Sequence, residues 1–263
     1  MLQVRSYGSA GPLAAVLHGG PGAPGSMAPD ARALAADFRV IEPFQRRAGG
    51  PEPLSVARHV ADLEEVLAAR GERAAVVGHS WGAMLALAFA AAHSERVASL
   101  VLVGCGTFDR AARAAMHARI AERRGDAVVR RFARAAAVAD PDERMRLRAA
   151  ALRPVYAVDP ISDGDDVAEC DARGHEETWT DAMRLQAEGV HPRAFTAIRC
   201  PVLMLHGDFD PHPGPMIRAS LVPHLPQLEY RELVRCGHDP WLERAARDEF
   251  FSALRGWLLV RSS

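Results

Sequence analysis

Short apolar runs alternate along the chain with longer segments in which apolar residues recur every three or four positions. The short runs are too brief for helices and are bounded by glycine, proline or charged residues, so they predict buried strands. They cover residues 13–17, 39–44, 74–77, 100–103, 202–205 and 228–234, and residues 1–7 alternate in the manner of a further short strand.

The longer segments predict helices over residues 29–37, 56–70, 82–93 and 240–259. Within 56–70, Val60, Leu63 and Leu67 share one helical face, and charged residues occupy the other. Strands that alternate with helices pair mostly in parallel, because each crossover places a helix on a face of the sheet. We therefore expect an α/β fold with a mostly parallel sheet covered by helices on both faces.

The alternation stops between about residues 108 and 196. This stretch has the composition of helices, being rich in Ala, Arg and Glu, and Pro141, Pro154 and Pro160 divide it into pieces. We expect a helical cap, or lid, over residues 108–196, inserted into one α/β core that comprises residues 1–107 and 197–263. The first half of the insertion is basic and the second is acidic, which is typical of solvated helix faces.

Composition limits the classes of function. The chain has 263 residues, of which 49% are hydrophobic and 25% charged, enough for one large core with an insertion. A formal net charge of -1 provides no overall field for nucleic acid or an anionic membrane, so we expect neither partner. The oligomeric state is not indicated. A small-molecule substrate is the expected ligand.

Targeting signals are also missing from the pattern. The start of the chain lacks the basic residues and apolar run of a signal peptide. The longest uncharged apolar stretch, residues 81–92, is shorter than the roughly 20 residues that cross a bilayer. We expect a cytoplasmic location, and the absence of lysine and asparagine is typical of a GC-rich, bacterial coding sequence.

Metal and cofactor motifs are not evident in the chain. The cysteines form no C-x-x-C pair, so free thiols are expected at Cys105, Cys170, Cys200 and Cys236. The acidic residues that follow residue 158 lack the ligand spacing of a calcium loop. A phosphate-binding G-x-x-x-x-G-K-[ST] loop is impossible without lysine. We expect neither a metal nor a cofactor.

The most specific motif is Gly78-His79-Ser80-Trp81-Gly82, which follows one predicted strand and opens the next predicted helix. A nucleophile held at the top of a sheet needs a very tight strand-to-helix turn, and glycines on either side relieve the crowding of that turn. The pattern is G-x-S-x-G in this context. It predicts that Ser80 is a catalytic nucleophile.

A serine nucleophile needs a base and a carboxylate that orients the base. On this type of scaffold the chain order is Ser, then acid, then His. Asp208 and Asp210 follow a predicted strand, where α/β sheets place their sites, and we favour Asp210 with Asp208 as the reserve. His238 follows the last predicted strand and is the expected base. His212 is a weaker candidate because it lies only two residues from Asp210.

Glycines also follow the strand at residues 13–17, in the sequence His18-Gly19-Gly20-Pro21-Gly22. They would allow a backbone N–H to point into the site, and the N–H of Trp81, next to the nucleophile, would supply a second donor. We expect these two groups to form an oxyanion hole, with Gly20 favoured over Gly19 as the first donor.

Taken together, these motifs resemble the α/β-hydrolase superfamily, and His-Gly-Gly-Pro-Gly with Gly-x-Ser-Trp-Gly is most similar to its proline iminopeptidase branch. The resemblance covers the strand framework on both sides of the insertion and implies a triad of Ser80, Asp210 and His238. Where that branch carries D-x-R-G-x-G-x-S, this chain has residues 42–50 with the sequence EPFQRRAGG. The insertion is also shorter than in those peptidases.

The predicted function is a serine hydrolase that cleaves an ester or amide of a small substrate through an acyl-enzyme, either carboxylesterase-like or proline iminopeptidase-like. An aminopeptidase needs carboxylates that bind the free amine, and Glu169, Glu176 and Glu177 in the acidic half are the candidates, with Glu188 as a further one. An esterase or thioesterase needs no such cluster. The alternative is a hydrolase-fold protein without turnover that binds a ligand or a partner protein.

Overall fold

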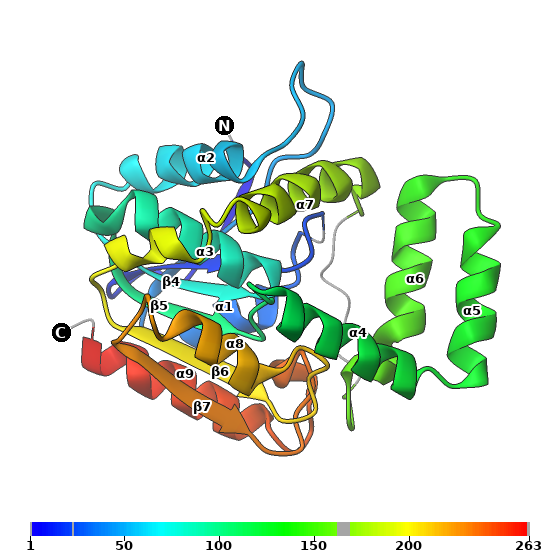
Figure 1. The fold of residues 1–263 in the computed structure, drawn as a ribbon. Coiled ribbons are helices and arrows are strands. Elements are labelled where there is room, and N and C mark those ends of the chain that lie inside the picture. Colours follow the sequence, from blue (N-terminus) through cyan, green and yellow to red (C-terminus); the bar gives the residue numbers. More distant parts are fainter. Residues whose placement is uncertain (1, 23, 162–168, 262–263) are drawn as a thin grey trace.

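The computed structural model describes residues 2–22, 24–161 and 169–261 (Figure 1). Within this described part the chain forms a seven-stranded sheet in the order β1-β3-β2-β4-β5-β6-β7. The strands are β1 Val4–Tyr7, β2 Leu13–Leu17, β3 Arg39–Pro43, β4 Ala74–His79, β5 Val97–Val103, β6 Val202–Gly207 and β7 Leu228–Leu233. Strand β1 pairs antiparallel with β3, and the other pairs are parallel. The mostly parallel α/β sheet is therefore confirmed.

Helices connect the parallel strands and cover both faces of the sheet (Figure 1). The helices are α1 Ala28–Leu34, α2 Val56–Ala68, α3 Trp81–Ala92, α4 Arg110–Arg123, α5 Asp126–Ala136, α6 Pro141–Tyr156, α7 Ala172–Ala187, α8 Gly214–Leu221 and α9 Arg247–Arg261, with 3₁₀ turns η1 Ser94–Arg96, η2 Arg193–Ala197 and η3 Pro240–Leu242. The predicted helix at 240–259 was wrong at its start. The structure has the separate turn η3 there, and α9 begins at Arg247.

The core has two layers because alternate residues of each strand point to opposite faces. In β2, Leu13, Ala15 and Leu17 join the cluster that contains α2 and α3. The other β2 residues, Ala14 and Val16, join the cluster that contains α1 and α9. Helix α3 is buried along nearly its whole length, so the segment that begins beside Ser80 is fixed at the centre of the fold.

Four helices, α4 to α7, separate β5 from β6, and we call them the helical segment. Its α5–α6 hairpin projects away from the sheet (Figure 1), and a small cluster of Ile120, Val128 and Val155 joins α4, α5 and α6. The boundaries predicted for a lid remain a prediction. No helix among the described residues combines the length and the apolar character that a membrane span requires.

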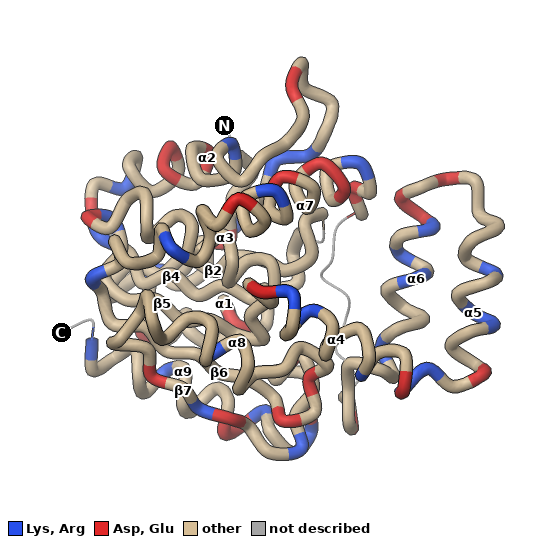
Figure 2. Tube along the Cα trace, viewed as in Figure 1, with Lys and Arg blue, Asp and Glu red and all other residues tan. Residues whose placement is uncertain are grey.

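Charges on the helical segment are arranged as the sequence indicates. Arginines predominate on α5 and α6, and both signs occur on α7 (Figure 2). On α7, Arg184 pairs with Asp181 and Glu188 at 2.7 Å each, and Arg173 pairs with Glu177 at 2.7 Å. These pairs lie within one helix, at separations of three or four residues that bring side chains together.

Candidate active site

Ser80 lies on a sharp turn between β4 and α3. Its backbone adopts φ 54° and ψ -117°, a left-handed conformation that costs energy for a residue other than glycine. The turn is held by a hydrogen bond from Ser80 N to Val103 O at 2.8 Å. A strained backbone at a partly exposed serine is the geometry that a nucleophile on this motif requires.

The flanking glycines are needed because backbone atoms approach them closely. A Cβ atom on Gly78 would lie 2.2 Å from Gly82 O, and a Cβ on Gly82 would lie 2.2 Å from Leu17 O and 2.6 Å from His18 O. Real Cβ atoms do not come so near to backbone oxygens. The two glycines therefore allow α3 to begin directly against the end of β2.

Replacement of Gly82 by Ala is expected to destabilise the fold by roughly 1–3 kcal/mol, because the added methyl group overpacks a rigid backbone contact. Gly256 is the matched control: it lies in the exposed middle of α9, and its Cβ would meet no atom within 4 Å. Gly256→Ala should raise the free energy of unfolding by about 0.5–1 kcal/mol. Urea unfolding of both variants measures whether the free energy of unfolding falls for Gly82→Ala and rises for Gly256→Ala. Equal changes would contradict the close approach of Leu17 O and His18 O to Gly82.

Asp210 and His238 come together beyond the ends of β6 and β7. His238 Nδ1 donates to Asp210 Oδ2 at 2.7 Å, and the Asp210 side chain is completely buried. Asp208, the reserve acid, instead accepts a hydrogen bond from Cys236 N at 3.0 Å. The structure thus brings His238 into contact with the favoured acid and gives Asp208 a role in the backbone of the histidine loop.

The pKa values of this pair shift in opposite directions. Burial by itself would raise the pKa of Asp210, but the charges of His238, His212 and His206 outweigh it and hold that pKa well below its ordinary value. Burial would likewise lower the pKa of His238, but the Asp210 carboxylate outweighs it and raises that pKa above 6.5. Asp210 is therefore an ionised hydrogen-bond acceptor that stabilises a proton on His238.

Ser80 and His238 both lie against the end of β5. Ser80 N donates to the carbonyl of Val103, the last residue of β5. The next residue, Gly104, lies against the His238 ring, because a Cβ atom built on it would be 3.1 Å from His238 Nδ1. Within the described ranges Ser80 Oγ has no hydrogen bond to His238. Catalytic hydrogen bonds of this kind are often long without substrate and tighten when it binds.

The loop after β2 lies directly beside Ser80. A Cβ atom on Gly19 would lie 3.1 Å from Ser80 Cβ, and Gly20 has φ 30°, which favours glycine. Trp81 is the first residue of α3, where backbone N–H groups lack intrahelical partners. The positions of Gly20 and Trp81 are thus compatible with the predicted oxyanion hole.

Gln45 ties these parts together, a link that the sequence did not indicate. Its backbone N–H donates to His18 Nε2 at 3.1 Å, its side chain donates to His18 O at 3.0 Å, and Trp81 Nε1 donates to its Oε1 at 2.8 Å. Burial lowers the pKa of His18 to about 4, so this imidazole is neutral and can accept. His18 therefore organises the loop.

Two other residues that the sequence analysis did not single out support the His238 loop. His79 Nε2 donates to His238 O at 3.0 Å. Glu243 is buried, and its carboxylate accepts from Gly237 N at 3.0 Å and from Val158 N and Asp159 N at 2.9 Å. Glu243 thereby joins the histidine loop to the chain that follows α6. His79 lies within the Gly78–Gly82 motif, and that motif is the one sequence signal that could have indicated its role.

Two arginines of α4 contact the acid loop. Arg119 donates to Asp210 O at 3.3 Å, and Arg123 donates to Phe209 O and stacks over the Phe209 ring at 3.7 Å. These arginines lie in the basic half of the insertion, which the sequence favours as a solvated face. Part of that charge is instead used to hold the backbone on either side of Asp210.

The three glutamates expected to bind a substrate amine have other partners or face solvent. Glu177 accepts from Leu54 N at 2.8 Å and pairs with Arg173. Glu169 lies 3.7 Å from Arg47 and its side chain is 91% exposed, and Glu176 is exposed. The acidic half therefore anchors the loop before α2, where Asp181 also accepts from Val56 N.

Asp210, His212 and His238 form a cluster in the described part of the chain whose nitrogen and oxygen atoms lie within 4.8 Å of one another. The two imidazole rings are stacked at an angle of 20°, and their Nδ1 atoms bond to different oxygens of the carboxylate. Nearly parallel rings directed at separate oxygens do not converge on one ion. We assign these donors to hydrogen bonding.

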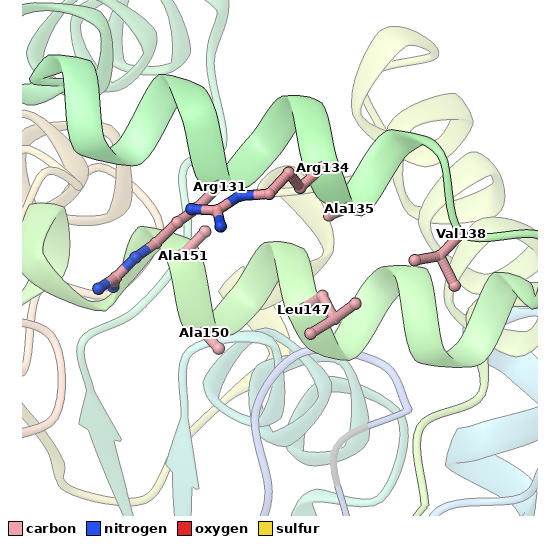
Figure 3. A pocket seen from close by; sticks show the side chains of 7 residues that line it. All are labelled: Arg131, Arg134, Ala135, Val138, Leu147, Ala150 and Ala151. Atoms are coloured by element: carbon pink, nitrogen blue, oxygen red, sulfur yellow. The ribbon is translucent and has the colours of Figure 1, made fainter.

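A groove of about 490 Å³ lies between α5 and α6. Figure 3 shows Arg131, Arg134, Ala135 and Val138 from α5 and its following turn facing Leu147, Ala150 and Ala151 from α6. The lining contains no nucleophile, acid or base, and it shares no residue with the Ser80 site. The groove therefore has no part in the chemistry of that site.

Comparisons with known proteins agree with the fold. A 97-residue stretch is 41% identical to proline iminopeptidase of Neisseria gonorrhoeae, and the match covers 34% of this chain and 31% of that protein. A thermophilic esterase from Thermogutta terrifontis superposes with a TM-score of 0.67 at 21% identity, over 100% of this chain and 94% of that one.

Two further solved structures show the same architecture. Proline iminopeptidase of Mycobacterium smegmatis has a TM-score of 0.66 at 21% identity and is matched over 98% of this chain and 94% of its own. The enol-lactonase of Burkholderia xenovorans has a TM-score of 0.64 at 21% identity, over 98% and 96%. The model of the alpha/beta hydrolase family matches residues 15–253, so this chain is a member of that family.

Proposed function

We propose that this protein is a serine hydrolase that cleaves a small ester through an acyl-enzyme intermediate, with Ser80 as nucleophile, His238 as base and Asp210 as the orienting acid. The observation that carries the proposal is the 2.7 Å hydrogen bond from His238 Nδ1 to a fully buried Asp210, beside a serine on a strained turn. Because Nδ1 holds the proton, Nε2 remains free to accept one from Ser80.

In the proposed reaction, Ser80 Oγ attacks the carbonyl carbon and its proton passes to His238 Nε2. The backbone N–H groups of Gly20 and Trp81 stabilise the oxyanion of the tetrahedral intermediate. His238 then returns the proton to the leaving alcohol as the bond to it breaks. A water molecule, deprotonated by His238, then attacks the acyl group. His238 returns this proton to Ser80 Oγ as the acyl bond breaks and the acid leaves.

The environments of the glutamates favour an ester over an aminoacyl amide. Recognition of a free α-amine needs a carboxylate directed at the site, whereas Glu177 is engaged by Leu54 and Arg173, and Glu169 and Glu176 face solvent. A neutral ester makes no such demand. The second candidate is proline iminopeptidase activity, which the 41% identity over 97 residues favours.

We also propose that the helical segment acts as the lid of this site. Tyr156, at the end of α6, accepts a hydrogen bond from His238 N at 2.8 Å and places its ring 5.4 Å from that of His238. On α7, Trp179 lies edge-on to Trp81 at 6.2 Å. Residues of this segment thus surround the groups beside Ser80, which supports a role in binding the acyl chain.

A substrate panel tests the proposed function. Purified protein would be assayed with p-nitrophenyl acetate and butyrate, a thioester, a lactone and prolyl-naphthylamide, each beside a Ser80→Ala control. Ester hydrolysis that is lost in the control supports the proposal, and prolyl-naphthylamide cleavage without ester cleavage supports the second candidate. Binding of the esters without turnover by the wild type would instead indicate the silent, ligand-binding alternative.

A further inference from the structure

The acid of the triad has two imidazole partners with side-chain hydrogen bonds. His238 Nδ1 bonds to Asp210 Oδ2 at 2.7 Å, and His212 Nδ1 bonds to Oδ1 at 2.9 Å. The backbone N–H of His212 donates to the same Oδ1 at 2.9 Å. The reaction proposed above uses only the first imidazole, so the second has no role assigned to it.

The hydrogen-bond roles follow from the charge of Asp210. An ionised carboxylate can only accept, so both Nδ1 atoms must donate a proton to it. His206 adds a third ring: its Nε2 donates to His212 O at 2.9 Å and lies 3.3 Å from Oδ2. Burial lowers the pKa of His206, and its hydrogen bond to His212 O fixes the backbone of His212.

The two imidazoles that bond to Asp210 also touch each other. Their ring centroids are 4.6 Å apart with an interplanar angle of 20°, and Tyr156 from α6 packs against both. His212 thus fixes the catalytic dyad at two points. It holds one oxygen of the carboxylate, which leaves the other directed at His238, and it supports one face of the His238 ring.

We propose that His212 is a positioning residue for the hydrolytic reaction, which holds the Asp210 carboxylate and the His238 ring in line. The proposal rests on the proposed function, because it assigns a role in that mechanism. It makes His212 a support of the Asp210–His238 pair and not a substitute base.

Two substitutions separate the two roles of His212. His212→Asn keeps an N–H donor near the position of Nδ1 but removes the ring that stacks on His238, and His212→Phe keeps an aromatic ring on His238 but removes the donor. His117, exposed on α4, provides the matched controls His117→Asn and His117→Phe. All variants would be compared by thermal unfolding, and kcat and KM would be measured on p-nitrophenyl butyrate from pH 5 to 9.

We expect the Asn variant to keep kcat at pH 8 within about threefold of the wild type and the Phe variant to lose about tenfold, because a loosened carboxylate misplaces the base. KM should stay unchanged in both. The His117 variants should superpose on the wild type.

Equal losses of kcat in the Asn and Phe variants would overturn the proposal and leave a merely structural role. A kcat equal to that of the wild type in both variants would overturn it as well. If the Phe variant fails to fold, a loss of kcat well beyond threefold in the Asn variant would overturn the proposal. Failure of the proposed function is recognised separately, because the wild type itself would then show no ester hydrolysis and no labelling by a fluorophosphonate.

Discussion

Replacement of Ser80 by Ala is expected to lower kcat for ester hydrolysis by roughly 10⁴- to 10⁶-fold, because the variant lacks the only oxygen that we assign as nucleophile. The fold should persist. Alanine occupies the same left-handed conformation at φ 54° with no larger side chain, and Ser80 is partly exposed. Rates would be measured on p-nitrophenyl butyrate at enzyme concentrations high enough to detect the residual activity.

Controls for Ser80→Ala are its thermal unfolding curve and its affinity for a non-hydrolysable substrate analogue, both of which should match the wild type. A variant that folds normally and retains more than about one hundredth of the wild-type kcat would be incompatible with covalent catalysis by Ser80. Such a result would favour a mechanism in which water attacks the ester directly and His238 acts as the base.

Asp210→Asn is expected to lower kcat by about 10⁴-fold. An amide in place of the carboxylate leaves the geometry nearly intact but favours the wrong tautomer of the histidine and cannot stabilise its charged form. In this protein the same carboxylate raises the pKa of His238, so the base should protonate at lower pH in the variant. The pH profile of the residual activity would measure that displacement of the acid limb.

Asp208→Asn is the matched control for the acid. It changes the neighbouring candidate, whose Oδ1 accepts from Cys236 N at 3.0 Å, and an asparagine oxygen can keep that bond. We expect less than a tenfold change in kcat. The reverse ranking, with Asp208→Asn the more damaging of two folded variants, would contradict the assignment of Asp210.

Much of the architecture was predictable because local pattern and tertiary environment agree. The strands at 13–17, 74–77 and 202–205 are short apolar runs, and the corresponding β2, β4 and β6 are fully buried. Helix α8 was not predicted. Its eight residues contain Gly214 and Pro215, and only Ile217 and Leu221 supply an apolar face, too little for helical spacing to be recognised.

The start of the last helix shows a different limit. Pro240 is a favourable first residue for a helix, and the sequence from it to Leu259 is compatible with one. The structure instead uses Pro240–Leu242 as a 3₁₀ turn, and the buried Glu243 after it binds the backbone of Gly237, Val158 and Asp159. A partner far away in the chain decides this boundary, and local propensity does not contain that information.

The residues of the candidate site also divide into those that the sequence predicts and those that only the fold reveals. Ser80, Asp210 and His238 follow from motif context and chain order, and the structure brings the last two into contact. Gln45 and Glu243 act through contacts with residues distant in the sequence, so no local pattern marks them. His79 lies inside the serine motif, but its contact with His238 depends on the fold. His212 was weighed only as a rival base, since its bond to Asp210 and its stacking on His238 depend on the folded loop.

The central claim is that Ser80 is an activated nucleophile, and covalent labelling tests it most directly. The protein would be treated with a fluorophosphonate, and the site of modification would be located by intact-mass and peptide mass spectrometry. The account predicts one phosphonyl group per chain, on the peptide that contains Ser80, and none on Ser80→Ala or heat-denatured protein. Absence of the adduct from folded wild type, or modification of another residue with Ser80 untouched, would contradict it.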